Sequence, residues 1–278
     1  MRTVELCPGI RSSVLGFGCA PIGGSVGGEV ARRALATALD EGITHFDLAR
    51  SYGYGDAESF VGGYLKSRRD EVVLATKFGI VATPQARLLR PIKPLVRWAK
   101  QMRSRQSPTA GTAVTGSVAF GDRFHKRLPI TADNMRASLE KSLRALKTDR
   151  VDYLFIHEPH ETILDIEALA AEAASLKRAG KIIAWGVAFM RDRQEQLESV
   201  LEKADVLQYN LSPGADAYVA IRSARSDKPN VFFSPFRGAP DEMPRDVVLR
   251  TLTTDFPKSV VLCSMFSEKH IRANAALF

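Results

Sequence analysis

The 278-residue sequence predicts a (β/α)8 TIM barrel, and two observations carry this prediction. Eight short apolar runs rich in β-forming residues recur along the chain, with amphipathic stretches between them. Most runs start 23 to 31 residues after the previous one, which is the length of a strand–helix–strand unit. The expected strands are Val14–Gly18, Ile43–Asp47, Val72–Lys77, Val151–His157, Ile182–Val187, Asp205–Gln208, Val231–Ser234 and Ser259–Cys263.

The amphipathic stretches are expected to form the helices, because their apolar residues recur at helical spacing on one face. The clearest of them are Glu29–Glu41, Ala132–Leu146, Ile163–Ala179 and Arg191–Lys203. Thr131 and Asp133 stand at the start of one of these stretches, and both are residue types that cap helix N-termini. We therefore expect Thr131 or Asp133 to cap the helix Ala132–Leu146.

An open, doubly wound sheet is the rival architecture. Such a sheet normally carries the spacing GxGxxG after its first strand to bind a dinucleotide. Here the first expected strand continues as Gly16-Phe17-Gly18-Cys19-Ala20-Pro21, which does not match that spacing. The glycine-rich segment 23–28 does not match it either. The barrel is therefore favoured.

The basic residues are concentrated in one segment of the chain. The formal net charge is +8, yet residues 81–128 hold ten Lys/Arg and one acid, and the remainder holds 29 basic and 30 acidic residues. A nucleic-acid-binding protein more often spreads its positive charge over a face of its core, so no nucleic-acid partner is expected. We expect one barrel domain over residues 1–278, with 81–128 as a basic loop and helix insertion after the third barrel strand.

The insertion contains an amphipathic stretch over residues 95–105. Leu95, Trp98 and Met102 share one helical face, and basic residues project from the others. Three interpretations stay open: a solvated loop resting on the barrel, a lid that selects an acidic or carrier-tethered substrate, or a helix that docks on a membrane surface. In the last two, residues 87–105 would contact the carrier protein or the membrane.

The composition excludes several other classes of protein. No run of 18 or more apolar residues exists, so no membrane span is expected. The first thirteen residues lack the apolar core of a secretory signal, and the three cysteines contain no CxxC pair, so a reducing cytoplasm is expected. The segment His157-Glu158-Pro159-His160 is not the HExxH zinc motif, and no metal site is expected.

Three of the apolar runs end in an ionisable residue, namely Asp47, Lys77 and His157. The carboxyl ends of barrel strands meet at one mouth, where active sites lie. Tyr52 follows Asp47 on a glycine-flanked loop, and an ammonium such as that of Lys77 would lower the pKa of its phenol. Asp47 would hold the lysine, and His157 would orient a carbonyl. Tyr52 is thus a candidate proton donor, and Tyr54 is a competing phenol.

These residues belong to a series of segments, and the series resembles the aldo-keto reductase superfamily in order and spacing. The resemblance covers nearly the whole chain except 81–128. The segments are Gly16–Gly18, Gly42–Asp47, Tyr52–Gly53 with Glu58, Ala75–Gly79, Ser138–Asp149, Val151–His157, Gly180–Ile182, Gly186–Val187, Gln208–Asn210, Ser234–Phe236 and His270–Asn274. The resemblance implies a (β/α)8 barrel, hydride transfer between a nicotinamide nucleotide and a carbonyl, and four catalytic residues. These are Asp47, Tyr52, Lys77 and His157.

The resemblance also implies cofactor-binding residues, with departures from the family pattern. They are Gln208, Phe233, Ser234, Phe236, His270 and Asn274. Relatives carry Ser-Asn against the nicotinamide where this chain has Ala188-Phe189, so two polar side chains are missing. The Lys-Ser and arginine that often surround the 2′-phosphate are also replaced, and Lys269 and Arg272 are substitutes to consider. NADP(H) is favoured over NAD(H) at the level of the family.

Two functions follow as hypotheses. The first is an NAD(P)H-dependent oxidoreductase that interconverts a carbonyl (an aldehyde or a ketone) and an alcohol. The alternative is a non-catalytic nucleotide-binding regulatory or partner protein on the same scaffold, motivated by Ala188, Phe189 and the basic segment. The expected partner of the first is a small-molecule carbonyl or alcohol. Arg50 would bind an anionic substrate or pair with Glu58.

Overall fold

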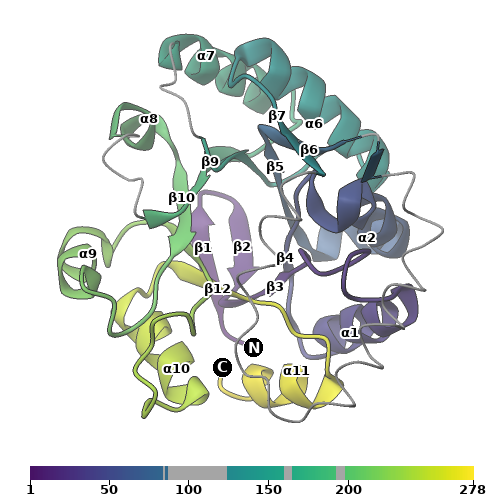
Figure 1. Cartoon of the computed structure of the whole chain (residues 1–278). Coiled ribbons are helices and arrows are strands. Elements are labelled where there is room, and N and C mark those ends of the chain that lie inside the picture. Colours follow the sequence, from purple (N-terminus) through teal and green to yellow (C-terminus); the bar gives the residue numbers. More distant parts are fainter. Residues whose placement is uncertain (84, 87–123, 160–164, 192–197) are drawn as a thin grey trace.

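A computed structural model describes residues 1–83, 85–86, 124–159, 165–191 and 198–278. Eight parallel strands close into a barrel in which neighbours in sequence are neighbours in space, so the predicted fold is confirmed (Figure 1). Each strand lies within two residues of its predicted bounds. The strands are β3 (Leu15–Gly18), β4 (His45–Asp47), β5 (Val73–Phe78), β8 (Tyr153–His157), β9 (Ala184–Phe189), β10 (Val206–Asn210), β11 (Asn230–Phe233) and β12 (Ser259–Cys263).

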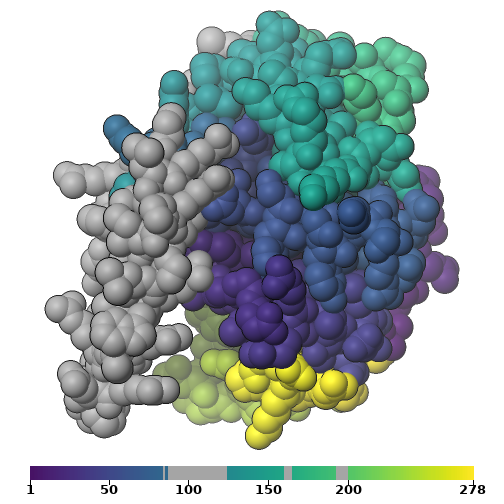
Figure 2. Space-filling model, turned by 90° about the vertical axis from the view of Figure 1, so that its right-hand side faces the viewer, coloured from purple at the N-terminus to yellow at the C-terminus, as the bar shows by residue number. Residues whose placement is uncertain are grey.

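The helices surround the barrel, and each packs its apolar face on the strands (Figure 1). They are α1 (Gly28–Asp40), α2 (Ala57–Leu65), α6 (Ala132–Leu146), α7 (Ile166–Arg178), α8 (Glu198–Lys203), α9 (Tyr218–Arg225), α10 (Arg245–Asp255) and α11 (Glu268–Ala275). On the face shown in Figure 2, α11, α1, α2 and α6 follow one another as a continuous layer. Among the described residues, no helix is long and apolar enough to cross a bilayer.

The helix α6 begins and ends where its sequence predicts. The Thr131 hydroxyl accepts a hydrogen bond from the backbone N–H of Asn134 over 3.2 Å, which is the cap expected from the residue type. Lys147 ends the helix in a left-handed conformation, with its N–H bonded to the carbonyl of Leu143. The predicted helix over 191–203 is observed as α8 at its C-terminal end, and 192–197 lie outside the described residues.

An N-terminal hairpin, which the sequence analysis did not predict, covers the end of the barrel where the strands begin. It pairs β1 (Thr3–Cys7) with β2 (Ile10–Ser13) and leads directly into β3. Its apolar residues, including Leu6 and Ile10, join the side chains inside the barrel in one buried cluster. The hairpin thus closes one end and leaves the opposite mouth for chemistry.

The predicted insertion leaves and rejoins the barrel as a two-stranded ribbon. Strand β6 (Ile80–Ala82) pairs antiparallel with β7 (His125–Arg127), with Ile80 opposite Arg127. The ribbon follows β5 at the carboxyl end of the barrel strands. The amphipathic stretch 95–105 lies outside the described residues, so its predicted helix and its three interpretations stay predictions.

Candidate active site

The strand ends bring four polar side chains together at the open mouth. Asp47 ends β4, Lys77 lies near the end of β5, His157 ends β8 and Gln208 lies within β10. All four are buried and line a cavity of about 550 Å³. Removing a charged group from water costs free energy unless the group has a partner. The hydrogen bonds of these side chains therefore define what the site can do.

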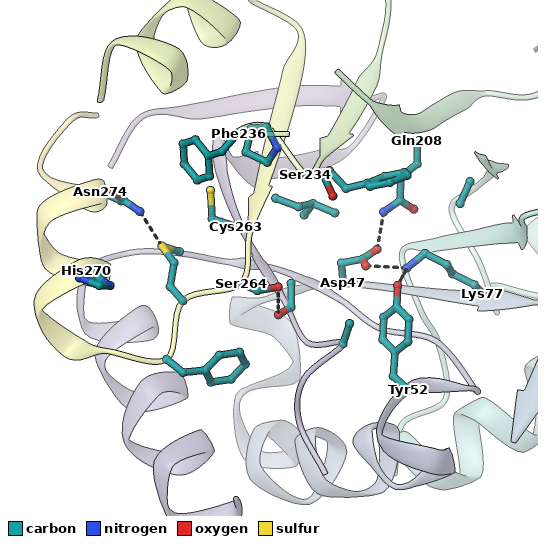
Figure 3. A pocket seen from close by; sticks show the side chains of 18 of the residues that line it. Asp47, Tyr52, Lys77, Gln208, Ser234, Phe236, Cys263, Ser264, His270 and Asn274 are labelled. Atoms are coloured by element: carbon teal, nitrogen blue, oxygen red, sulfur yellow. Dashed lines mark hydrogen bonds and ion pairs between the residues drawn. The ribbon is translucent and has the colours of Figure 1, made fainter. Parts of the chain in front are cut away.

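The ammonium of Lys77 uses all three of its N–H groups. It donates to Asp47 Oδ2 over 2.6 Å and to the phenol oxygen of Tyr52 over 3.0 Å (Figure 3). Its third hydrogen bond goes to the backbone carbonyl of Leu48 over 2.9 Å. Burial opposes the charge, but Asp47 and Tyr52 outweigh it and hold the pKa of Lys77 above its ordinary value. The lysine is therefore a fixed cation beneath the phenol.

Two left-handed residues bring Tyr52 back over the mouth. The short helix η1 (Tyr52–Gly55) has Gly53 at φ 58° and Tyr54 at φ 59°, so the chain reverses immediately after Tyr52. A Cβ on Gly53 would lie 2.1 Å from the carbonyl oxygen of Ile22, so only glycine fits there. Tyr54 instead packs edge-on against Phe124, with ring centroids 5.8 Å apart. The structure thus brings Tyr52, and not Tyr54, to Lys77.

The phenol of Tyr52 is protonated at neutral pH. Burial raises its pKa to about 12, even though the charge of Lys77 acts in the opposite direction. Lys77 does lower the pKa of Tyr52, as expected, but burial raises that pKa by more, so the net shift is upward. Because Lys77 donates to the phenol oxygen, the Tyr52 proton does not point at the ammonium, and no described residue accepts it.

His157 stands beside this phenol as a neutral imidazole. Burial, with the charges of Lys77 and Arg127, lowers its pKa well below the ordinary value. The two rings are perpendicular, with centroids 5.8 Å apart. The buried Nδ1 of His157 has no hydrogen-bond partner among the described residues. A carbonyl oxygen between these rings would meet one O–H and one neutral imidazole.

Gln208 carries an unused acceptor next to Asp47. Its Nε2 donates to Asp47 Oδ1 over 2.9 Å, while its buried Oε1 has no partner among the described residues. Ala188 forms part of the cavity wall, whereas Phe189 faces outward and packs on Tyr209 with ring centroids 5.6 Å apart. The replacement at 189 thus lies behind the wall, and only the replacement at 188 removes a polar group from the cavity surface.

A second group of predicted residues extends the cavity away from Tyr52. Phe233 ends β11. Ser234 and Phe236 follow this strand, and His270 and Asn274 lie on α11 (Figure 3). All ten sequence-predicted site residues therefore line one cavity. The sequence analysis missed two charged residues that also line it, Glu158 and Arg245. Residue type and position relative to strand ends gave no signal for Arg245, because it begins helix α10.

Three other candidates lie elsewhere. Arg272 forms an ion pair with Glu41 over 2.7 Å, and Lys269 is exposed and does not line the cavity. Neither residue is thus a cavity cation. Arg50 lies close enough to act on the pKa of buried Glu58, which burial raises and Arg50 lowers. Both alternatives for Arg50, pairing with Glu58 and binding an anionic substrate, stay predictions.

Comparison with known proteins shows the family of the chain. The model of the aldo/keto reductase family matches residues 14–213. The chain belongs to the aldo/keto reductase family. D-threo-aldose 1-dehydrogenase from Pseudomonas sp is 30% identical over 189 residues, which cover 66% of this chain and 51% of that protein. The chain spans about half the length of the curated relatives it matches.

Solved structures of family members share the fold. A putative aldo-keto reductase from Pseudomonas aeruginosa superposes with a TM-score of 0.72 at 22% identity and covers 99% of this chain and 94% of that one. An aldo-keto reductase from Klebsiella pneumoniae in complex with NADPH superposes with a TM-score of 0.65 at 20% identity and covers 99% and 89%. At these identities the likeness concerns the barrel itself.

Proposed function

We propose that this chain is an NAD(P)H-dependent oxidoreductase that interconverts a carbonyl and an alcohol, with Tyr52 as the general acid. One observation carries the proposal. The three N–H groups of Lys77 are all used, one of them on the phenol oxygen, so the Tyr52 proton is directed to the cavity beside neutral His157. A phenol poised in this way is of no use to a protein that only binds nucleotides.

The roles of the residues follow from these contacts. Tyr52 donates its proton to the carbonyl oxygen as the oxygen becomes an alcohol, and Lys77 stabilises the phenolate that is left. Asp47 holds the ammonium in place, and His157 hydrogen-bonds to the carbonyl oxygen and fixes its position. A bound nicotinamide nucleotide supplies the hydride that completes the reduction. In the reverse direction, the phenolate takes the proton from the alcohol.

The cavity residues fit a nicotinamide nucleotide. The unpartnered Oε1 of Gln208 is an acceptor that would take a hydrogen bond from the nicotinamide carboxamide. Phe233 would stack on the ring, and Ser234 and Phe236 would contact the middle of the nucleotide. His270 and Asn274 would hold its adenosine end. A preference for NADP(H) over NAD(H) is part of the proposal.

The proposed substrate is a small carbonyl compound or alcohol. Because a named relative is an aldose dehydrogenase, aldoses belong among the compounds to test. An anionic substrate would depend on basic residues of the insertion, so each neutral carbonyl is best paired with a carboxylate-bearing analogue. Faster turnover of the charged member of each pair would favour the lid interpretation.

The decisive experiment has two stages. First, the purified protein is titrated with NADPH and, separately, with NADH, and the change in cofactor fluorescence is followed. Second, oxidation of the bound cofactor is followed with the carbonyl panel. We expect micromolar binding, tighter for NADPH, and multiple turnovers. Binding without turnover would favour the non-catalytic alternative, and no binding up to millimolar concentrations would contradict both.

A further inference from the structure

One cation of the cavity has no role in the chemistry described above. Arg245 is the first residue of α10 and lines the cavity beyond the loop that follows β11. Its Cζ lies 5.2 Å from the centroid of the Phe236 ring, so the guanidinium rests on an aromatic surface. Its charge also acts on Cys263, whose thiol pKa burial raises to about 12 and Arg245 lowers. The side chain therefore belongs to the cavity wall.

Arg245 differs from the neighbouring basic residues because they form ion pairs with carboxylates. Lys77 is bound to Asp47, and Arg272 is bound to Glu41 outside the cavity. Among the described residues, Arg245 forms no ion pair and no side-chain hydrogen bond, and its guanidinium contacts the ring of Phe236. The guanidinium packs on Phe236, and its five N–H donors are available to a ligand.

The surroundings of Arg245 suit an anionic group. Ser234, His270 and Asn274 line the same cavity. The two carboxylates that line it, Asp47 and Glu158, form ion pairs with Lys77 and Arg127 and not with Arg245. A planar guanidinium on an aromatic ring matches the oxygens of a phosphate and forms two parallel hydrogen bonds with them. A carboxylate ligand would fit the same fork, but the proposed nucleotide carries phosphates.

We propose that Arg245 binds a phosphate group of the nucleotide, because the basic residues after β12, Lys269 and Arg272, do not line the cavity. This inference rests on the proposed function. Two phosphate sources share the chemistry, namely the 2′-phosphate of NADP(H) and the diphosphate of either cofactor. In both cases Arg245 contributes affinity at a distance from Tyr52 and takes no part in proton transfer.

The test measures binding of nucleotide fragments that lack the nicotinamide, so its readout is independent of turnover. Adenosine 2′,5′-bisphosphate and ADP are titrated by calorimetry into the wild-type chain, Arg245→Gln and Arg245→Lys. Arg250→Gln is the matched control, because Arg250 is an exposed arginine on the same helix that does not line the cavity. The thermal midpoint of each variant shows that it is folded.

We expect Arg245→Gln to weaken binding about ten- to hundredfold, the loss typical of a charge-assisted hydrogen bond, with Arg245→Lys intermediate and Arg250→Gln unchanged. A loss for the bisphosphate alone identifies the 2′-phosphate, and a loss for both fragments identifies the 5′-linked phosphates. If wild-type and Arg245→Gln bind both fragments equally, this inference falls and the proposed function stands. If the wild-type chain binds neither fragment, both fall.

Discussion

The ammonium of Lys77 donates a hydrogen bond to the phenol oxygen of Tyr52 over 3.0 Å. The same Nζ lies 4.8 Å from the centroid of the tyrosine ring, so the cation stands at the oxygen end of the phenol. This relationship fixes which lone pair of the phenol oxygen is occupied and leaves the O–H directed to the cavity. The predictions below test what depends on it and on the packing around it.

Replacing Tyr52 by Phe removes the proton donor and keeps the ring. We expect kcat for carbonyl reduction to fall about 10²- to 10⁴-fold, because that is the usual contribution of a general acid. The dissociation constant for NADPH should change by no more than about twofold, since the phenyl ring still fills the same space. Steady-state kinetics and cofactor titration check both statements. Tyr54→Phe is the control, and unchanged turnover in Tyr52→Phe would sink the mechanism.

The buried pair of Asp47 and Lys77 should be strongly coupled in stability. Lys77→Met leaves the Asp47 carboxylate buried without its cation, and we expect it to cost about 3–5 kcal/mol of unfolding free energy. Adding Asp47→Asn should recover part of this loss, because the second change removes the uncompensated charge. Denaturant unfolding of both single variants and the double variant completes the cycle. Additive losses would contradict the coupling.

His45 should make the fold sensitive to acid. It lies fully buried in β4, and burial lowers its pKa from 6.5 to about 4. Between these values the unfolded chain binds a proton that the folded chain does not, so stability is present above pH 6.5 and is lost as pH falls toward 4. The loss is on the order of 3 kcal/mol. Urea unfolding across this range should show a flatter pH dependence for His45→Gln than for the wild-type chain. An equal slope in both would disprove the assignment.

Gly62 and Gly63 are neighbours in α2 with opposite predicted responses to alanine. A Cβ on Gly62 would lie 2.3 Å from Cα of Leu146, where α2 packs against α6, so Gly62→Ala should cost about 3 kcal/mol. A Cβ on Gly63 meets nothing closer than 3.8 Å, and helix propensity should make Gly63→Ala up to about 1 kcal/mol more stable. Thermal midpoints of the two variants decide this. The prediction fails if both variants shift in the same direction.

Glu158 is a non-glycine residue in a left-handed conformation at the rim of the cavity. Its φ is 45°, and two hydrogen bonds hold it: its N–H donates to Ala188, and its carbonyl accepts from Arg127, each over 2.7 Å. Asparagine tolerates this conformation better than glutamate, so Glu158→Asn should stabilise the fold by about 1 kcal/mol. A thermal shift measures this. A lower midpoint would show that the half-exposed ion pair with Arg127 outweighs the backbone strain.

The barrel strands and the residues at their ends can be predicted from the sequence. The spacing of the apolar runs and the polarity of the strands predict the barrel and the convergence of Asp47, Lys77 and His157 at one mouth. Residue type predicts a cap at Thr131 or Asp133, and the structure has it at Thr131. Parallel strands in a closed barrel must bring their carboxyl ends together, which is why three residues far apart in sequence can be assigned to one site in advance.

The position of Tyr52, the direction of Phe189 and the N-terminal hairpin depend on local backbone conformation and on contacts between distant segments. The choice between Tyr52 and Tyr54 depends on two left-handed residues, and the outward direction of Phe189 depends on where β9 ends. The N-terminal hairpin and its contacts inside the barrel also have no counterpart in the spacing of the strands.

The sequence by itself therefore determined the barrel and the residues at the strand ends, because both follow from a local pattern repeated along the chain. Its resemblance to the family came from the order and spacing of matching segments. The tertiary structure alone decided which phenol meets Lys77, that burial keeps this phenol protonated, and that Arg245 rather than Arg272 lines the cavity. The physical reason is that pKa values and ion pairs depend on distances and solvent exclusion between segments, which no local pattern encodes.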